Sequence, residues 1–390
     1  MKKILILCLL FIYFCYLFVL PTKSYATVDP LSTPNNKIGI DILFPEELKQ
    51  VPDLVNSNGG DWGYVTVVIQ AGDKNLDKWQ AFMDQAKKQH IIPIVRLATE
   101  GDYFNTKVWR RPTDSDVLDF ANFLTSLDWP VKNRYVVFFN EVNRGDEWGG
   151  STDPAGYAKL LSFATTVFKS QSQDFFIISS GLDNAAPNLD GLYMNEYNFM
   201  QQMNLSVPGI FNQIDGLGSH SYPNPGFSQN PSIDSPTSIN SFQYEKSLAL
   251  SLGGKNLPVF ITETGWSRDS VSDDTASGFY TTALNTVFSD KSIVAITPFL
   301  LQGGGSQFGK FSLLDQSGKP TKQYLAIKNF PKVHGNPQIA NSVLGAESAR
   351  IKSNGLNTLP TYNFSNLPDP NHNYLFSKKL QIIFNLLMKI

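Results

Sequence analysis

The chain has 390 residues, a formal net charge of −2 at pH 7 and a charged fraction of 17%. This even balance provides neither the basic surface of a nucleic-acid-binding protein nor an acidic tail, so we expect no nucleic acid as a partner. The length fits either one large barrel-type domain with a tail or two ordinary domains.

Residues 1–26 have the pattern of an export signal. Two lysines precede an unbroken apolar run over residues 4–20, and Ser24 and Ala26 fit the small-x-small pattern before a cleavage site. We therefore expect cleavage after Ala26 and a secreted or cell-envelope protein. Because the run approaches the length of a membrane span, an uncleaved N-terminal anchor is the alternative, and it is the only membrane contact that we expect.

The cysteine and histidine content argues against a metal site or other cofactor. Cys8 and Cys15 both lie within the apolar run, so the chain after residue 26 can form neither a disulfide nor a thiolate site. The four histidines form no His-x-x-x-His pair. We expect no cofactor.

After a linker over residues 27–36, short apolar runs alternate with segments of helical period, in eight pairs. The predicted strands are 37–44, 63–70, 91–99, 134–143, 175–183, 216–222, 257–266 and 293–302. The predicted helices are 45–56, 76–89, 115–127, 154–170, 192–203, 239–252, 275–288 and 322–330. This alternation requires parallel crossovers, and eight units predict an α/β fold, a (β/α)8 TIM barrel over residues 37–330.

Two regions leave alternatives open. A doubly wound open sheet would also alternate strands and helices, but Pro45 follows the first strand where a Gly-x-Gly-x-x-Gly turn would be expected. Residues 331–390 are polar and aperiodic up to about residue 378, which indicates a linker or mobile tail. The apolar last residues form a short helix that docks on the barrel, a membrane-surface helix, or a segment without a fold of its own. We expect a monomer with a single catalytic domain.

In a barrel of this kind the active site lies at the C-terminal ends of the strands, so the residues that close the strands are the candidates. They are Arg96 on the third strand, Asn140 and Glu141 on the fourth, His220 and Tyr222 on the sixth, Glu263 and Trp266 on the seventh, and Gln302 on the eighth. Two carboxylates thus point into one mouth. Retaining cleavage of a glycoside needs such a pair, roughly 5 to 5.5 Å apart.

Three motifs carry a family resemblance. The pair Asn140-Glu141, the motif His220-x-Tyr222 and the run 262–266 (Thr-Glu-Thr-Gly-Trp) resemble the clan A glycoside hydrolases, retaining enzymes on a (β/α)8 barrel. Each motif falls on the strand that the clan requires. Val142 stands where many members have proline, and the eighth strand lacks the tryptophan that often lies under the sugar. We therefore assign no family within the clan.

The resemblance implies roles for the matching residues. Glu141 would be the general acid and base, and Glu263 the nucleophile. Asn140 would bind the sugar 2-hydroxyl, and Tyr222 would hold Glu263. His220 would line the same subsite. Arg96 is a looser match, since in several families the arginine lies on the second strand; it would keep Glu263 ionised.

Aromatic side chains at the predicted mouth are candidates for stacking on sugar rings. Trp266, Phe299 or Phe308 would replace the missing tryptophan of the eighth strand. Trp148, in the loop after Glu141, is either a sugar platform or a packing residue.

We expect an exported retaining glycosidase that acts on a β-linked polysaccharide or oligosaccharide. A carbohydrate-binding barrel without catalysis and a transglycosylase with the same residues are the alternatives. Most loops after the predicted strands look short, which favours an open groove and cleavage within a chain.

Overall fold

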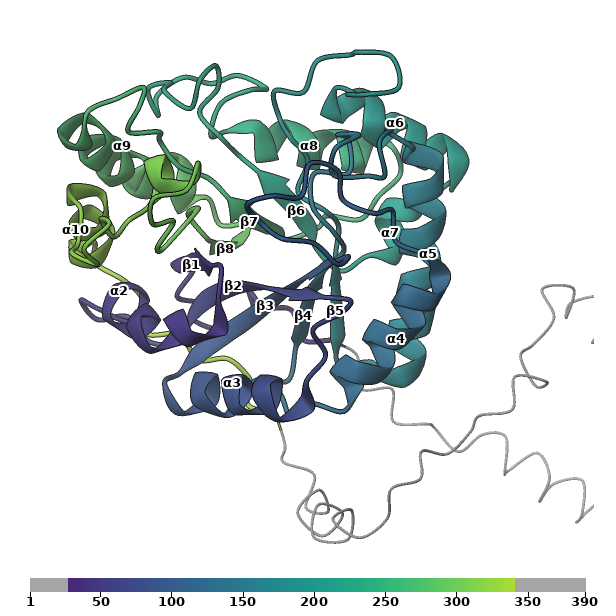
Figure 1. Cartoon of the computed structure of the whole chain (residues 1–390), viewed down its shortest axis with the longest axis horizontal. Helices are drawn as coiled ribbons and strands as arrows, with labels where there is room; N and C mark the ends of the chain where they lie inside the picture. Colours follow the sequence, from purple (N-terminus) through teal and green to yellow (C-terminus); the bar gives the residue numbers. More distant parts are fainter. Residues whose placement is uncertain (1–26, 341–390) are drawn as a thin grey trace, which may run out of the picture. The chain divides into compact units, whose positions relative to one another are not determined.

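The computed structural model describes residues 27–340, and these form a barrel of eight parallel strands surrounded by helices (Figure 1). The strands are β1 (Gly39–Ile42), β2 (Gly63–Gln70), β3 (Ile91–Ala98), β4 (Arg134–Val137), β5 (Phe175–Ile178), β6 (Leu217–His220), β7 (Val259–Glu263) and β8 (Ile293–Ile296). The (β/α)8 fold expected from the alternation of strands and helices is confirmed.

Hydrogen-bonded ladders join β1 to β5 in one sheet and β6 to β8 in another. Parallel bridges close the two gaps between the sheets, from Ile178 to Gly216 and from Ile38 to Ile296. At the second gap the amide of Ile296 donates to the carbonyl of Lys37 at 2.8 Å. The strands therefore form a closed ring, and their C-terminal ends meet at one mouth.

Most of the helices begin at side-chain caps. They are α2 (Val51–Val55), α3 (Leu76–Lys88), α4 (Asp114–Thr125), α5 (Pro154–Gln171), α6 (Glu196–Ser206), α7 (Ile210–Gln213), α8 (Ser241–Ser251), α9 (Asp273–Asn285) and α10 (Lys322–Asn329), with short 3₁₀ helices η1 (Pro45–Gln50), η2 (Val287–Ser289) and η3 (Gly309–Phe311). The side chains of Asn75, Thr113 and Ser272, for example, accept hydrogen bonds from amides of the first turns of α3, α4 and α9.

Strands β4 to β8 end before their predicted ends, and two predicted helices differ from the structure. The predicted helix 45–56 is divided into η1 and α2, because Pro52 cannot donate the backbone hydrogen bond that would continue η1. The predicted helix 192–203 begins only at Glu196, where the side chain of Asn195 caps the first turn of α6.

Aromatic rings fill the inside of the barrel. Tyr135 lies 5.1 Å from Phe176 and 5.4 Å from Phe260, centroid to centroid, and Tyr64 contacts Tyr135 at 6.2 Å. Burial of one such side chain stabilises the fold by about 1.5–3 kcal/mol. The barrel interior is therefore a packed core, and the site must lie above it at the mouth.

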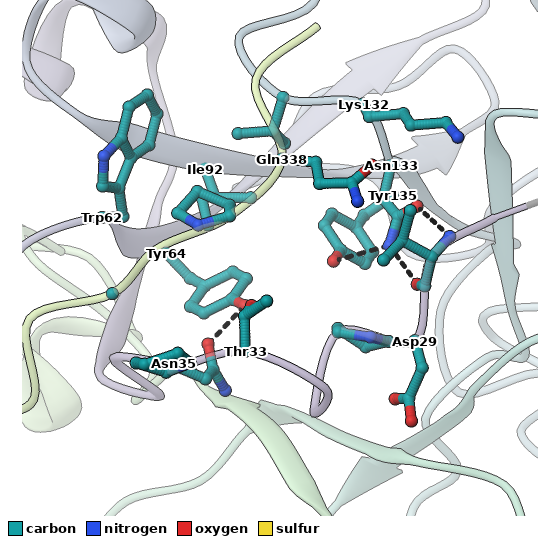
Figure 2. Close-up of a pocket in the computed structure, with 16 residues that line it drawn as sticks. Asp29, Thr33, Asn35, Trp62, Tyr64, Ile92, Lys132, Asn133, Tyr135 and Gln338 are labelled. Carbon is teal, nitrogen blue, oxygen red and sulfur yellow. Dashed lines mark hydrogen bonds between the residues drawn. The ribbon is translucent and has the colours of Figure 1, made fainter.

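The segments before β1 and after α10 cover the N-terminal end of the barrel (Figure 2). The side chain of Asn133 binds both backbone groups of Val28, and the amide of Gly335 donates to the carbonyl of Asp61 at 3.0 Å. The enclosed space between the segments is about 30 Å³, room for one or two water molecules. It is too small for a ligand.

Residues 331–340 thus pack on the barrel, contrary to the prediction of a linker or mobile tail from residue 331 onward. Their polar, aperiodic sequence does not reveal backbone bonds to distant segments, such as the bond from the amide of Asn336 to the carbonyl of Pro34. The predicted linker 27–36 packs there too. The predicted signal or anchor and the rest of the tail lie outside the described residues, and within residues 27–340 no helix is long and apolar enough to cross a membrane.

Candidate active site

Glu141 lies in a turn after β4. The sequence predicts a strand over residues 134–143, but β4 ends at Val137, and the φ angles of Phe139 and Glu141 are positive, at 72° and 34°. Such angles are uncommon outside glycine and cluster at functional sites. The amide of Glu141 donates to the carbonyl of Gly181 at 3.1 Å, so the chain after β5 fixes this turn.

Glu263 closes β7 and is buried, with 7% of its surface exposed. Arg96 Nη1, from β3, donates to its Oε1 at 2.5 Å, and the hydroxyl of Tyr222 donates to its Oε2 at 2.9 Å. The strands β3 and β7 and the chain just after β6 therefore supply one carboxylate and its two partners.

These partners keep Glu263 ionised. Burial alone raises the pKa of the carboxyl, but the charges of His220 and Arg96 and the hydrogen bond from Tyr222 outweigh that effect, so its pKa lies below the ordinary value. Asp41, on β1, behaves in the opposite way. Burial, reinforced by the charge of Glu263, raises the pKa of Asp41 well above its ordinary value. A neutral Asp41 leaves Arg96 to neutralise Glu263.

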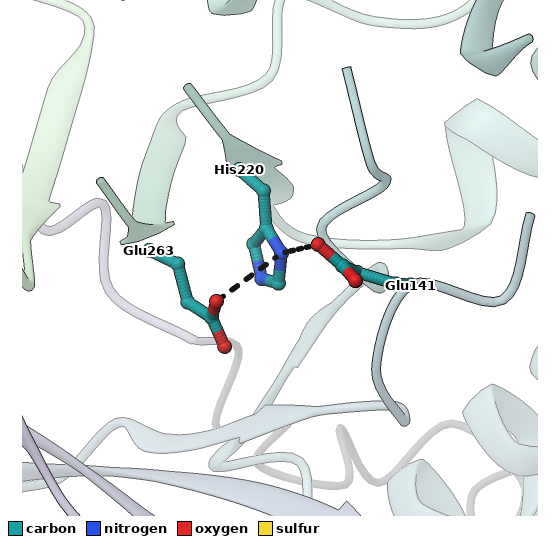
Figure 3. A group of neighbouring side chains, drawn as sticks. All are labelled: Glu141, His220 and Glu263. Atoms are coloured by element: carbon teal, nitrogen blue, oxygen red, sulfur yellow. Dashed lines mark hydrogen bonds and ion pairs between the residues drawn. The ribbon is translucent and has the colours of Figure 1, made fainter. Parts of the chain in front are cut away.

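His220, the last residue of β6, lies between the two glutamates (Figure 3). Its Nδ1 is 3.1 Å from Glu141 Oε1 and 3.7 Å from Glu263 Oε2. Burial lowers the pKa of the imidazole, but the two carboxylates raise it more, so its pKa is higher than usual. The ring needs Gly181 beside it, because a Cβ there would lie 2.1 Å from its Cδ2. His220 thus sits close to both carboxylates.

Among residues 27–340, Glu141, His220 and Glu263 are the set whose ligand atoms lie close enough together for a metal ion, all within 4.8 Å of one another. The surroundings favour a proton over a cation. Arg96 already binds Glu263, and Arg144 Nε lies 3.6 Å from Glu141 Oε2. The raised pKa of His220 further opposes metal binding, which requires the neutral ring.

Arg96 holds Asn140. The Oδ1 atom of Asn140 accepts a hydrogen bond from Arg96 Nη1 at 2.5 Å, which orients the side-chain amide. Glu147 lies nearby in the cleft wall, and burial and the charge of Glu141 raise its pKa to about 7. Glu147 was not predicted from the sequence, because this carboxyl lies in a loop and not at the end of an apolar run.

A cleft of about 470 Å³ opens above these groups, a volume typical of small-molecule sites. Aromatic side chains form much of its wall: Tyr103, Trp109, Tyr222, Phe227, Phe299, Phe308 and Phe311. Phe299 and Phe308 were candidates from the sequence. Tyr103, Trp109, Phe227 and Phe311 were not, because they lie in loops without a periodic pattern. The cleft therefore offers several faces on which sugar rings can stack.

Charged side chains form the wall next to Glu141. Arg144 Nη2 binds Asp146 at 2.8 Å and its Nη1 binds Asp183 at 3.0 Å. Both ion pairs are shorter than the contact from Arg144 to Glu141. Arg144 is thus held mainly by the two aspartates, and Glu141 keeps His220 as its hydrogen-bond partner.

Four candidates from the sequence do not line the cleft. His220 was expected to line the sugar subsite, but it is 1% exposed and is not among the residues of the cleft wall, although it contacts both glutamates. The ring of Trp266 is fully buried against Tyr280 at 4.9 Å, and its Nε1 donates to the carbonyl of Gln229. Trp148 is 1% exposed and packs against Phe139, so it is a packing residue and not a sugar platform. Gln302 is not among the residues that line the cleft, because β8 already ends at Ile296.

Comparison with known proteins supports the fold. No family model matches the sequence, and no curated protein matches it. Several solved structures match the fold. A family 39 β-xylosidase from Caulobacter crescentus aligns with a TM-score of 0.55 at 14% identity, over 76% of this chain and 72% of that one. A glucosidase from Croceicoccus marinus aligns with a TM-score of 0.54 at 12% identity, over 77% and 69%.

A family 39 glycoside hydrolase from Bacteroides cellulosilyticus WH2 aligns with a TM-score of 0.52 at 15% identity, over 77% of this chain. This chain spans 64% of the length of that protein. The structure neighbours are glycoside hydrolases with the clan A barrel fold, and no single family can be assigned among them.

Proposed function

We propose that the protein is a retaining glycoside hydrolase that cleaves a β-linked polysaccharide or oligosaccharide, with Glu141 and Glu263 as its catalytic pair. The main support is that both carboxylates face one imidazole, with oxygens within 4.8 Å of each other. Such an approach fits the retaining separation of about 5–5.5 Å and is too close for the inverting separation of about 6.5–9.5 Å.

In the first step of the proposed reaction, Glu263 attacks the anomeric carbon of the sugar and forms a glycosyl ester. The bond from that carbon to the leaving oxygen breaks, and the leaving oxygen takes the proton of Glu141. In the second step Glu141, now ionised, takes a proton from water. The water oxygen displaces Glu263 from the anomeric carbon, which restores both carboxyl groups.

The neighbours of the pair match these roles. Arg96 and Tyr222 bind the two oxygens of Glu263, which keeps this carboxylate ionised and aims it. Asn140, fixed by Arg96, has an amide nitrogen available for the 2-hydroxyl of the sugar under attack. His220 Nδ1 lies 3.1 Å from Glu141 Oε1, within hydrogen-bonding distance, and so orients this carboxyl group toward the cleft.

We further propose that the protein acts outside the cytoplasm, on the basis of the export-signal pattern in residues 1–26. A β-linked substrate is consistent with the β-xylosidase among the structural neighbours. No cofactor takes part in the proposed reaction, and a monomer suffices because one chain supplies every residue named.

The test is turnover by the Glu263→Gln variant on β-glucans, xylans, mannans and galactans. Because the amide cannot serve as a nucleophile, we expect loss of turnover by about three orders of magnitude or more. Glu46→Gln, an exposed glutamate outside the cleft, is the matched control and should keep full activity. A fully active Glu263→Gln variant would exclude the mechanism.

The stereochemistry of the product gives an independent check. Proton NMR during hydrolysis should show the β anomer first, because two displacements at the same carbon restore its configuration. An α anomer as first product would contradict the double displacement. Wild-type protein that binds these glycans and cleaves none of them would instead be a carbohydrate-binding barrel.

A further inference from the structure

The loop after β3, residues 99–113, is not a short strand-end connection. It links Ala98 of β3 to Asp114 of α4 and supplies Tyr103, Thr106, Lys107 and Trp109 to the cleft wall. From the sequence we expected mostly short loops after the strands, and hence an open groove. The structure contradicts this expectation, because the connections 99–113, 138–153, 179–195, 221–240 and 297–321 are all long.

Internal hydrogen bonds hold the tip of the loop in one conformation. The side chain of Asp102 accepts from the amide of Phe104 and from the side chain of Asn105, each at 2.8 Å. The hydroxyl of Thr106 accepts from the amide of Asp102 at 2.7 Å. At its base, the amide of Trp109 donates to the carbonyl of Asp146 at 2.7 Å. The loop therefore presents two adjacent aromatic rings, those of Tyr103 and Phe104, on a fixed turn.

Those two rings reach other loops of the mouth. Phe104 contacts Phe308, in the loop after β8, with centroids 6.2 Å apart. Tyr103 contacts Phe44, which follows β1, at 6.4 Å, and Trp109 at 6.0 Å. Phe308 in turn packs edge-on against Phe299 of the cleft wall at 5.5 Å. Loops from β1, β3 and β8 thus touch one another across one side of the mouth.

The position of the catalytic pair shows which side this is. The leaving group must lie beside Glu141, whose neighbours Arg144, Asp146 and Asp183 come from the loops after β4 and β5. In a ring of eight strands, β8 and β1 lie opposite β4 and β5. The loop after β3 starts next to β4, but the rings that its tip contacts, Phe44 and Phe308, follow β1 and β8. These contacts therefore lie on the far side, where the sugar attacked by Glu263 and any residues before it in the chain would lie.

We propose that this aromatic bridge closes the glycone side of the cleft, so that the enzyme removes short units from the non-reducing end of its β-linked substrate. The inference rests on the proposed glycosidase function. A chain that continued beyond the glycone would have to pass between Phe104 and Phe308, whose rings are in contact. The opposite side, lined by the charged groups near Glu141, stays free for the rest of the chain.

The test uses reducing-end-labelled hexasaccharides of β-1,3-glucan, β-1,4-xylan and β-1,4-galactan with the full-length protein. For any of the three that is cleaved, the first labelled products should be the penta- and tetrasaccharide. First labelled products of two or three sugars would show internal cleavage and overturn the inference while leaving the glycosidase function intact. If the protein cleaved none of these hexasaccharides and none of the polysaccharides in the panel above, the proposed glycosidase function itself would be overturned.

The double variant Phe104→Ala, Phe308→Ala tests the bridge directly. It should raise the share of internal cleavage several-fold, because a chain can then extend past the glycone. Phe104 is 44% exposed, so little core packing is lost, and a thermal unfolding curve checks the fold. Val108→Ala, in the same loop and 50% exposed, is the control and should keep the wild-type product pattern. A folded double variant with the wild-type pattern would contradict the role of the bridge.

Discussion

At the scale of single residues, the charge of Glu263 depends on Arg96. The carboxylate is nearly buried, and its pKa is low because nearby positive charge and a hydroxyl outweigh the cost of burial. Arg96 is itself tied to Asn140, so this one guanidinium serves both the nucleophile and the residue that would contact the 2-hydroxyl.

Replacing Arg96 by methionine should therefore raise the pKa of Glu263. Since the ionised form is the proposed nucleophile, the acid limb of the pH profile of kcat/KM should move to higher pH, by about one pH unit or more. Arg96→Lys keeps a positive charge and should give a smaller displacement.

Arg134→Met, at the N-terminal end of β4, is the control for this experiment, and its acid limb should stay in place. Identical acid limbs for wild type and Arg96→Met would contradict the assigned role of Arg96. A simple loss of folding would instead appear in the circular dichroism spectrum and would not move the pH limb of the remaining activity.

The candidate site was predictable from sequence only where it depends on strand ends. Glu263 and His220 close apolar runs, and the parallel barrel brings such ends together whatever the loops do. Whether an aromatic ring in a loop is buried or faces the cleft depends on the conformation of the loop. Trp148 and Trp266 turn inward and are buried, whereas Trp109 faces the cleft, and no local pattern distinguishes them.

At the scale of elements, the strands and most helices follow from local patterns. The cover of the barrel's N-terminal end does not, because residues 331–340 bind largely through backbone groups. Gly335 is one example. A Cβ at this position would lie 2.8 Å from the carbonyl oxygen of Asp61 and 3.1 Å from Cβ of Trp62. Only glycine allows this close approach.

Gly335→Ala should therefore displace the segment and lower the free energy of unfolding by about 1–3 kcal/mol, as overpacking does elsewhere. Gly278→Ala is the matched control, since this glycine lies within α9 with open space around it. It should be neutral or stabilising by about 0.5–1 kcal/mol. Urea unfolding of both variants measures the difference, and an equally stable Gly335→Ala protein would argue that the segment contributes nothing to stability.

At the scale of the whole molecule, several buried acids make the free energy of unfolding decrease as the pH rises. Burial raises the pKa of Glu47 and of Glu147 to about 7 each. Burial raises the pKa of Glu245 to about 7, and burial together with the charge of Glu245 raises the pKa of Glu196 well above its ordinary value. The two carboxylates beside His220 raise its pKa as well, against the effect of burial.

A group whose pKa is higher in the folded than in the unfolded protein stabilises the fold fully below its unfolded pKa. That contribution is lost as the pH rises through the folded value. Each of the four glutamates and the histidine named in the preceding paragraph has a raised pKa and therefore this sign. Asp116 has the other: its hydrogen bond from Arg110 lowers its pKa to about 2, so its contribution is lost only as the pH falls from the ordinary carboxyl range toward 2.

The free energy of unfolding should therefore decline from about pH 5 to about pH 8. For Glu47 alone, a rise in pKa from 4.5 to about 7 corresponds to roughly 3 kcal/mol at the upper end of this range. Its Oε1 accepts hydrogen bonds from the amides of Leu43 and Phe44, at 3.2 Å and 2.9 Å, which an amide oxygen could also accept. Glu47→Gln should thus keep these bonds and remove the charge.

Urea unfolding at pH 5, 6.5 and 8 should show a smaller decline for Glu47→Gln than for the wild type, with the largest gain in stability at pH 8. Asp77→Asn, an exposed residue in the first turn of α3, is the control and should follow the wild-type curve. A wild-type stability that stays constant or rises over this range would mean that the buried acids are ionised in the folded protein. Because a carboxylate costs several kcal/mol to bury without a partner, their neutral form is the one that the packing of these side chains favours.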